Sequence, residues 1–310
     1  MKFRKKVLLL ALQSAVGTPA TPTGALNAVL TKNLAIMPME GEALSRELDK
    51  EDFGADLATI VGRHVKVTFQ VEVAGSGTAG EPPAWGPAMV ACGHLQTVDD
   101  TTPGSEEVRY TPIDTALPAT LIVKHDTSLH TITDARGMVR LVTGKRRYAY
   151  LEFEFIGLYQ TPVHSTTALN PVTTAFVKPV PFRAATTEFT LFGETLCLNE
   201  LTLNGGQQNG FYECSEQETI QLENRQAQFE AKVVEPALND FNIYEEIEAD
   251  TDGELSYTHG TVAGNIVQWV AHHAQITNPP QREDDQGNIV LSLSGTQARV
   301  GALEYTVTVR

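Results

Sequence analysis

An alternating segment in the first half of this chain constrains its fold more than any other feature. In VKVTFQVEV, residues 65–73, valine or phenylalanine stands at every second position and polar residues fill the positions between them. A period of two is typical of a β-strand that buries one face and exposes the other. The segment therefore predicts a half-buried strand, and nothing in it requires a catalytic role.

The strand leads to a glycine-rich turn and then to a short helix. The turn is GSGTAG, residues 75–80, and the helix is expected over Ala84–Cys92. Because Pro87 lies inside that segment, the helix is either very short or begins nearer Trp85. Nucleotide-binding loops also lie between a strand and a helix, but no Lys-Ser/Thr pair follows and the surrounding pattern is not βαβ. We expect the glycines to serve a tight turn and close packing.

Short strands and turns are expected through the rest of the first half. Two segments lack strand patterns: Glu40–Asp56 is expected to be a loop with at most a short helix, and Thr97–Pro118 a loop. Regular short strands at this spacing favour a β-sandwich or barrel. The strand segments are Thr120–Lys124, Leu129–Thr133, Met138–Val142 and Tyr148–Phe155, with turns between them that include Asp134–Gly137.

A second half of similar plan follows a Pro/Thr-rich segment at 161–181. A helix is expected over Leu238–Ile247, because apolar residues recur there at spacings of three. The expected strands are Phe189–Phe192, Thr195–Leu203, Thr219–Leu222, Gln226–Val234, Leu255–His259, Asn265–Ala271, Ile289–Leu293 and Leu303–Val309.

Length and internal similarity predict two domains. A chain of 310 residues exceeds the size at which one core usually stops growing. Phe69 can be aligned with Phe229 and Leu151 with Leu303 at nearly equal offsets, which a diverged tandem duplication explains. We expect a mainly β chain with two tandem β-sandwich or barrel domains that each carry one short helix. The expected parts are an N-terminal arm at 1–34, a first domain at 35–160, a linker at 161–181 and a second domain at 182–310.

The negative charge of the chain is concentrated in its second half. The net charge is −15, and residues 163–310 hold 7 Lys and Arg against 20 Asp and Glu, whereas the remainder holds 16 against 18. An acidic surface repels phosphates, so high-affinity DNA binding is not expected. The passage of DNA along such a surface without binding is compatible with this charge.

Two interpretations of the N-terminus are open. Basic residues from Lys2 to Lys6 precede the apolar run Val7–Leu12, which resembles a secretory signal but is shorter than the usual apolar region. The alternative, which we favour, is an arm or edge strand that docks on a neighbouring molecule. No segment approaches the roughly 20 apolar residues of a membrane-spanning helix.

The chain offers no constellation that predicts catalysis, a metal or a cofactor. Cys92, Cys197 and Cys214 are expected to be free buried thiols, although Cys197 and Cys214 could meet across strands. The acidic clusters Asp250, Asp252, Glu254 and Glu283, Asp284, Asp285 are expected to be solvated turns, because neither has the full ligand spacing of a calcium loop. His259, His272 and His273 lack a metal partner at ligand spacing. We expect a protein that is not an enzyme.

Several motifs resemble those of the major tail tube proteins of long-tailed, non-contractile bacteriophages. The resemblance rests on Arg4–Leu34, residues 65–93, Tyr110–Pro112 and Leu129–Tyr159, and the second half resembles the family only in outline. Departures are Ala88, Met89 and Val90, where a Leu-Leu-Arg-like run is expected, and Asp134, where glycine is expected.

The resemblance implies a structural virion protein that polymerises as stacked rings into a tail tube. It implies homo-oligomeric rings whose sheets join into one cylinder, with tail terminator, distal tail and tape measure proteins as partners and genomic DNA passing through an acidic channel. Duplicated halves favour a trimer with pseudo-sixfold symmetry, with a hexamer as the alternative. The segments 40–56 and 97–118 are the expected contacts between rings. A secreted β-sandwich adhesin or carbohydrate-binding protein is the alternative function.

Overall fold

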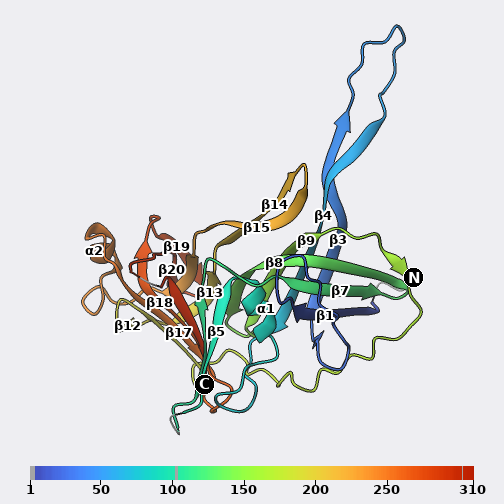
Figure 1. Cartoon of the computed structure of the whole chain (residues 1–310). Helices are drawn as coiled ribbons and strands as arrows, with labels where there is room; N and C mark the ends of the chain where they lie inside the picture. The colour runs from blue at the N-terminus through green and yellow to red at the C-terminus, as the bar shows by residue number, and fades with distance from the viewer. Residues whose placement is uncertain (1–3, 102–103, 302) are drawn as a thin grey trace.

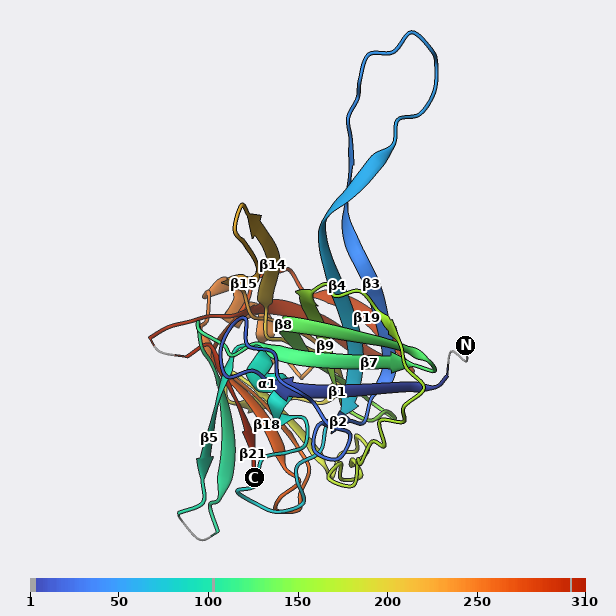
Figure 2. The ribbon, with the colours of Figure 1, turned by 45° about the vertical axis from the view of Figure 1, so that its right-hand side comes forward.

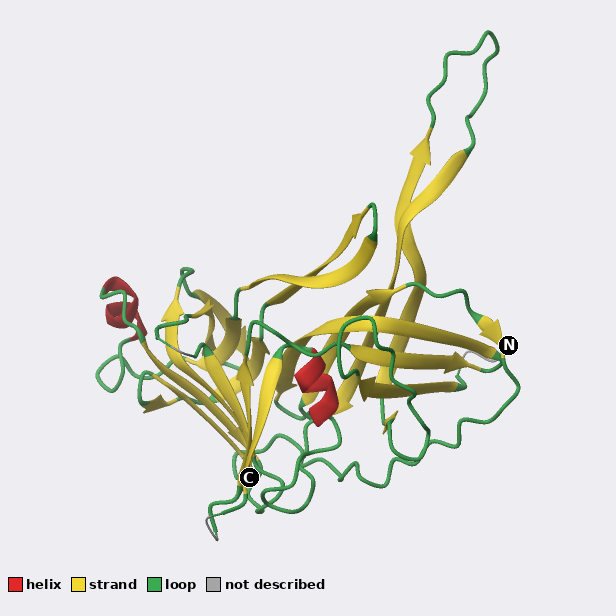
Figure 3. Cartoon of the chain, viewed as in Figure 1, coloured by secondary structure: helices red, strands yellow, loops and turns green. Residues whose placement is uncertain are grey.

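A computed structural model describes residues 4–101, 104–301 and 303–310 of the chain. Strands hold 54% of the residues and helices 4%, so the expectation of a mainly β chain with short helices is confirmed. Figure 3 shows the strands in yellow through both halves and the two short helices, α1 (Gly86–Ala91) and α2 (Ile243–Glu248), in red.

The first half, residues 4–164, surrounds the alternating segment. That segment forms the end of β4, and Val65, Val67, Phe69 and Val71 are all buried, as expected. The strands of this half are β1 (Lys6–Leu12), β2 (Ala28–Val29), β3 (Lys32–Ser45), β4 (Ala58–Glu72), β5 (His94–Asp99), β6 (Glu107–Pro112), β7 (Ala119–His125), β8 (Ser128–Gly144), β9 (Tyr150–Leu158) and β10 (Val163–His164).

The second half, residues 187–310, contains the remaining strands. They are β11 (Thr187–Leu191), β12 (Glu194–Thr195), β13 (Leu198–Asn204), β14 (Gln207–Cys214), β15 (Gln217–Arg225), β16 (Gln228–Val234), β17 (Gly253–His259), β18 (Val267–Ile276), β19 (Gln281–Asp285), β20 (Asn288–Gln297) and β21 (Tyr305–Val309). Figure 1 shows these elements in yellow to red beside the blue and green first half.

The two halves pair their strands in the same order. The first half pairs β1 with β2 and β7, β4 with β3 and β9, and β8 with β7, β9 and β10. The second half pairs β11 with β12 and β17, β16 with β13 and β20, and β18 with β17, β20 and β21. β20 pairs with β18 through residues 295–297 and with β19 through residues 288–292. β18 and β19 together therefore correspond to the single long strand β8.

A β-bulge at the same place strengthens this correspondence. Ala119 pairs with Ala135 while Leu121 pairs with Ile132, so two residues of β8 oppose one of β7. Gly253 pairs with Ala274 while Leu255 pairs with Ala271, which puts the same irregularity into β17 and β18. A bulge bends its strand, and in both halves it stands where the strand passes from one set of partners to the next.

One long antiparallel sheet runs through both halves. Its order is β3, β4, β9, β8, β13, β16, β20 and β19, and the step from β8 to β13 joins the first half to the second. A row of cross-strand partners on one face, Val71, Leu151, Leu141, Leu203 and Phe229, is fully buried. The opposite face carries a polar row, Gln70, Glu152, Arg140, Asn204 and Gln228. The sheet therefore has one face in the core and one in solvent.

Several expectations about the elements are wrong or only partly correct. In the segment 40–56, residues 46–56 form the expected loop but 40–45 belong to β3, and 97–118 contains the end of β5 and all of β6. The expected turn at 134–137 lies inside the single strand β8, because Asp134, with φ of 49°, belongs to the bulge. The helix expected from Leu238 begins at Ile243.

Two further corrections concern the ends of the halves. The segment expected to dock on a neighbouring molecule, β1, is paired along its length with β7 of its own chain, and Leu8, Leu9 and Leu10 are buried. The alignment of Leu151 with Leu303 is wrong, because β9 corresponds by its partners to β20. Residues 1–3, part of the basic N-terminal segment, and residues 102–103 of the expected loop lie outside the described residues.

Candidate assembly surfaces

The most prominent surface feature is the outer part of the β3 and β4 hairpin, residues 40–62, which we call the long hairpin. Figure 1 shows it in blue, projecting far from the rest of the chain. Phe53 is fully exposed, Leu57 is 93% exposed and Leu44 is 62% exposed. A soluble chain rarely displays large apolar side chains on a projecting segment without a partner, so the long hairpin is a candidate binding element.

A second hairpin projects at the opposite end of the molecule. It is formed by β5 and β6 and lies at the bottom of Figure 2, whereas the long hairpin lies at the top. Leu95 and Val98 on β5 are 51% and 43% exposed. The two segments expected to connect neighbouring rings therefore point in opposite directions.

A third hairpin, β14 and β15, occupies in the second half the place that the long hairpin occupies in the first. It lies between β13 and β16, which correspond to β3 and β4, and we call it the short hairpin. Its middle part packs on the first half: Phe211 stacks on His64 with ring centroids 5.4 Å apart, and Arg136 Nε donates to the Ile220 carbonyl at 3.0 Å. Ile220 is only 1% exposed.

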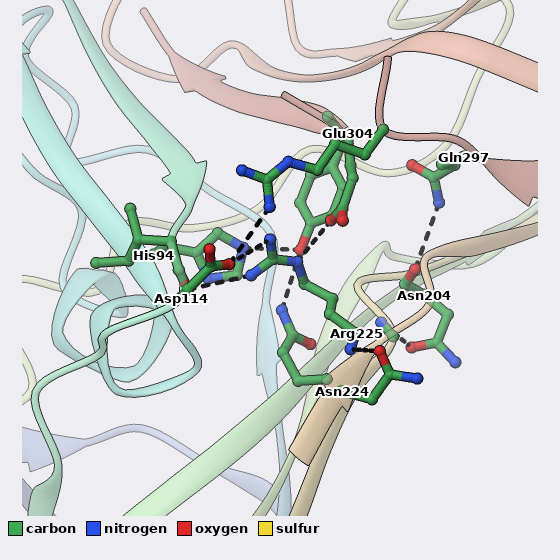
Figure 4. Close-up of polar contacts among 12 residues, drawn as sticks. His94, Asp114, Asn204, Asn224, Arg225, Gln297 and Glu304 are labelled. Carbon is green, nitrogen blue, oxygen red and sulfur yellow. Dashed lines mark hydrogen bonds and ion pairs between the residues drawn. The ribbon is translucent and has the colours of Figure 1, made fainter. Parts of the chain in front are cut away.

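A buried ion pair fixes the end of the short hairpin. Arg225 Nε lies 2.5 Å from Glu304 Oε2, and the two side chains are 6% and 9% exposed. The same guanidinium donates to the Ile113 carbonyl at 3.1 Å and lies 3.3 Å from Asp114 in the first half. Figure 4 shows this cluster between the two halves. A buried charge with several partners holds its neighbours in one arrangement.

A hydrogen-bonded chain of neutral groups crosses the same junction. Gln207 donates to the Tyr305 hydroxyl at 3.0 Å, that hydroxyl lies 2.9 Å from His94 Nε2, and His94 Nδ1 lies 2.9 Å from the Met89 carbonyl. The carbonyl requires a proton on Nδ1, so Nε2 accepts from Tyr305. Burial lowers the pKa of His94 to about 4 and raises that of Tyr305, because both charged forms are poorly solvated there. Both groups are therefore neutral near pH 7.

Two strand edges of the long sheet are open. In the part of the chain that the structure describes, β3 pairs only with β4, and β19 pairs only with β20. These are the first and last strands of the sheet. An open edge presents unpaired backbone donors and acceptors, which favours pairing with another chain.

The polar face of the long sheet carries more carboxylates than cations. Cross-strand ion pairs join Lys66 to Glu154 at 2.5 Å and Arg140 to Glu152. Arg136 also stands on this face, but the short hairpin engages it. Elsewhere on the inner strands β4, β9, β8, β13 and β16, the face holds three cations (Lys66, Arg140 and Lys232) and five carboxylates (Glu72, Glu152, Glu154, Glu200 and Glu230). The face is therefore weakly negative and largely self-neutralised.

An open groove of about 740 Å³ lies beside α1. Its lining is mostly apolar and includes Leu26, Pro87, Leu95, Leu117 and Phe176. A second groove of about 720 Å³ lies beside β11 and contains Cys197. The Thr187 hydroxyl in the lining of the second groove lies 2.9 Å from Nδ1 of His259.

The glycine-rich turn serves packing, as expected. Gly77 N–H donates to the Gly264 carbonyl at 2.9 Å, and a Cβ on Gly75 would lie 2.0 Å from that same oxygen. Trp85 stands at the N-cap position of α1, and its indole N–H donates to the Ala74 carbonyl at 2.7 Å. The turn thus connects the two halves by close backbone contact.

The acidic and histidine residues singled out from the sequence do not converge on one site. Glu283, Asp284 and Asp285 lie on β19, so the expectation of a turn is wrong there, and Lys232 and Lys145 pair with Glu283 and Asp285. Asp250 and Asp252 precede β17, and Glu254 lies on it. His273 contacts Asp252, His272 contacts Thr306, and His259 contacts Thr187 and Val180. Among the described residues, no group of three or more acidic, histidine or cysteine side chains could hold a metal ion.

The cysteines are free, but only one of them is buried. Cys92 is buried, and burial raises the pKa of its thiol, whereas Cys197 and Cys214 are exposed and do not form a disulfide. The expectation of burial is wrong for these two because they lie outside the core, at a strand boundary and at the tip of the short hairpin.

No helix within the described ranges is long and apolar enough to cross a membrane.

Sequence reasoning did not find the buried cluster around Arg225. Its partners Glu304 and Asp114 lie 79 and 111 residues away in the chain, and no local motif connects them. In the comparisons with known proteins, no family model matches this chain, and no curated protein matches it.

Proposed function

We propose that this protein is a structural virion protein that polymerises as stacked rings into the tail tube of a bacteriophage. The observation that carries the proposal is the long sheet, which crosses from β8 in the first half to β13 in the second and ends on two open edges. A chain that joins two similar units by strand pairing can join further units in the same way.

The open edges correspond to the two strands that meet inside the chain. β3 corresponds to β13, and β19 corresponds to the end of β8 that pairs with β13. Pairing of β19 in one copy with β3 in the next would therefore repeat the internal contact. We propose two tandem tube domains per chain and a ring of three chains with pseudo-sixfold symmetry, and a hexamer is the alternative. Ring closure removes the open edges.

The opposed hairpins support stacking of such rings. The long hairpin and the hairpin of β5 and β6 project from opposite ends of the chain. A ring that stacks on another would therefore use one end of its chains to contact the other end of the chains in the next ring, which is a heterologous contact. Heterologous contacts that do not close produce filaments. Stacking along this direction would extend rings into a tube.

The polar face of the long sheet suits the lining of a DNA channel. Outside the short hairpin, five carboxylates and three cations give it a weakly negative charge, and several of these charges are already paired. Such a face repels phosphates without holding them, which would allow genomic DNA to slide. Acids of both halves contribute to it. In this proposal, tail terminator, distal tail and tape measure proteins are the partners, and the tail of the virion, assembled in the host cytoplasm, is the location.

The position of β1 counts against a secreted adhesin with a cleaved signal. Signal cleavage would remove a strand whose Leu8, Leu9 and Leu10 are buried and whose backbone pairs with β7. Intact-mass measurement of the expressed protein is expected to show that the segment 4–12 is retained. A mature protein that lacks it would favour the adhesin.

Negative-stain electron microscopy of the purified protein tests the proposal directly. We expect rings or tubes with a central channel, and class averages that show three long projections per ring. A protein that stays monomeric at every concentration and ionic strength would contradict the proposal, and six identical projections would favour six chains per ring.

A further inference from the structure

The short hairpin shows how a hairpin of this fold is stabilised across a contact between two units. It contacts β8, β9 and β4 of the first half, across the internal strand pairing of β8 with β13. Arg136 Nε donates one hydrogen bond to the hairpin, to the Ile220 carbonyl at 3.0 Å, while its Nη1 donates to the Ala116 carbonyl of the first half at 2.7 Å. Asn209 Nδ2 adds a second hydrogen bond between hairpin and first half, to the Gly137 carbonyl at 2.9 Å.

The base of the long hairpin touches its own chain where Phe211 lies beside Gly62 and His64, but its apolar side chains around Ile60 stay exposed. Ile60 lies in the outer part of β4, which corresponds by strand order to β15, the strand that carries Ile220. Ile220 is 1% exposed, whereas Ile60 is 51% exposed, and Met37 and Met39 on the neighbouring strand are 52% and 41% exposed. An isoleucine is thus buried in the short hairpin, whereas the isoleucine and methionines at the base of the long hairpin are about half exposed.

The second half offers the surface that corresponds to the one under the short hairpin. Arg136 follows Ala135, the residue that ends the bulge of β8, and Gln275 follows Ala274, which ends the bulge of β18. The Gln275 side chain makes a hydrogen bond of 3.4 Å to the Asp250 carbonyl, and a glutamine amide has donors that can reach a backbone carbonyl as Arg136 does.

We propose that the base of the long hairpin, around Ile60, packs on β18 and β20 of a neighbouring copy of this chain in the same ring. This inference rests on the proposed ring. The partner is a second copy because the required surface is the second half of this chain, and β3, the strand that leads into the long hairpin, has the open edge that would pair with β19 of that copy. The contact continues the interface between units that is already present between the two halves.

According to this inference, the base and the tip of the long hairpin bind different partners. The base, at Ile60, contacts the neighbouring copy within the ring together with Met37 and Met39, which lie on β3 just before the long hairpin. The tip, at Leu48, Phe53 and Leu57, remains available for the next ring. A base substitution is therefore expected to impair ring closure, whereas a tip substitution is expected to impair stacking alone.

Photo-cross-linking tests the contact without relying on a variant that blocks assembly. A diazirine amino acid is placed at position 60 in one chain, and this chain is mixed with isotope-labelled parent protein before assembly. We expect cross-links, in single rings and in tubes, to labelled peptides that contain β18 or β20. The control is the same probe at Tyr212 in the short hairpin, which is 51% exposed and should cross-link within its own chain.

A pair of charge substitutions provides the second measurement. Ile60→Glu is expected to raise the concentration needed for ring formation at least roughly tenfold, because a carboxylate would be buried in the contact. Leu48→Glu at the tip should leave that concentration unchanged, and each monomer should keep its unfolding midpoint.

The possible outcomes distinguish this inference from the proposed function. Cross-links from position 60 that form only in tubes, or only to other segments of the neighbour, would overturn the inference and leave the ring intact. Normal ring formation by Ile60→Glu would do the same. Failure of the parent protein to form rings would overturn both.

Discussion

The long and short hairpins stand at the same point of two similar halves and have different surroundings. The short hairpin lies on the first half of its own chain, where Ile220 is buried and Arg225 contacts Ile113 and Asp114. The long hairpin extends from the body, with Phe53 and Leu57 exposed. In the proposed ring, the comparison means that this insertion point produces a contact between units, which one hairpin completes within the chain and the other completes with a neighbouring copy.

The largest expected effect comes from removing the outer part of the long hairpin. Ser45 and Ala58 are cross-strand partners, so an Asn-Gly turn can replace residues 46–57 and close the hairpin. We expect complete loss of tubes, because the tip is the proposed contact with the next ring. The unfolding free energy of the monomer should stay within about 0.5 kcal/mol of the parent, because the tip projects away from the body of its own chain. Electron microscopy and urea denaturation measure the two effects. Tubes of parental length would show that the tip is not the stacking element.

Breaking the buried pair under the short hairpin should cost more stability than any surface change. Arg225→Met leaves the Glu304 carboxylate, which is 9% exposed, without its cation. Removing one partner of a buried ion pair typically costs about 3–5 kcal/mol, and urea denaturation of the monomer measures it. As the control, Arg299→Met removes an exposed pair with Asp114 and should cost less than about 1 kcal/mol. Equal effects would mean that burial does not distinguish the two sites.

Acidification should weaken the same junction through His94. Burial lowers the pKa of His94 to about 4, below its ordinary value of 6.5, so the unfolded chain takes up the proton first as pH falls. The stabilisation is therefore complete above about pH 7 and is lost as pH falls toward 4, by roughly 3 kcal/mol in total. In His94→Gln, the loss of unfolding free energy between pH 7 and pH 4 should be smaller than in the parent by that roughly 3 kcal/mol. His164→Gln, an exposed histidine, should leave the slope unchanged, and parallel slopes for both variants would contradict the prediction.

The smallest expected effect compares the two isoleucines directly. Ile220→Val removes a methyl group from a buried side chain and should cost about 0.5–1.5 kcal/mol. Ile60→Val should leave monomer stability unchanged within error, because Ile60 is 51% exposed. Thermal denaturation of both monomers measures the difference. A cost at position 60 equal to that at position 220 would indicate that the long hairpin folds back on its own chain.

Local patterns predicted the parts of the fold where burial follows the period of the strand. The alternation over residues 65–73 correctly indicated the buried face of β4, and Pro87 correctly indicated a short helix that begins near Trp85. Residues 40–45 of the segment 40–56 were taken for a loop although they end β3, because this part of the strand has no core to contact and shows no apolar alternation. Acids on β19 were taken for a turn because their partners, Lys232 and Lys145, are distant in the chain.

The candidate surfaces depended on information that no single segment carries. The open edges of β3 and β19 follow from the whole set of strand pairings, including the long-range pairing of β8 with β13, and the role of Arg225 follows from partners in distant segments. Asp134 shows the same limit, because a residue with a positive φ suits a turn and a bulge equally well. The alignment of Phe69 with Phe229 found the corresponding strands, β4 and β16, but the paired rows set Phe229 against Val67, and the alignment at Leu303 was placed on the wrong strand.

The unequal length of the two hairpins has a consequence for angular register. In the proposed ring of three chains, long and short hairpins alternate at every step around the ring, although the strand scaffold beneath them repeats at each step. The strand scaffold of an added ring would fit the tube in six nearly equivalent rotations, because the scaffold repeats six times around the ring. The three long hairpins would fit in only three of these rotations. The hairpins would therefore select between two sets of three rotations that the scaffold alone does not distinguish.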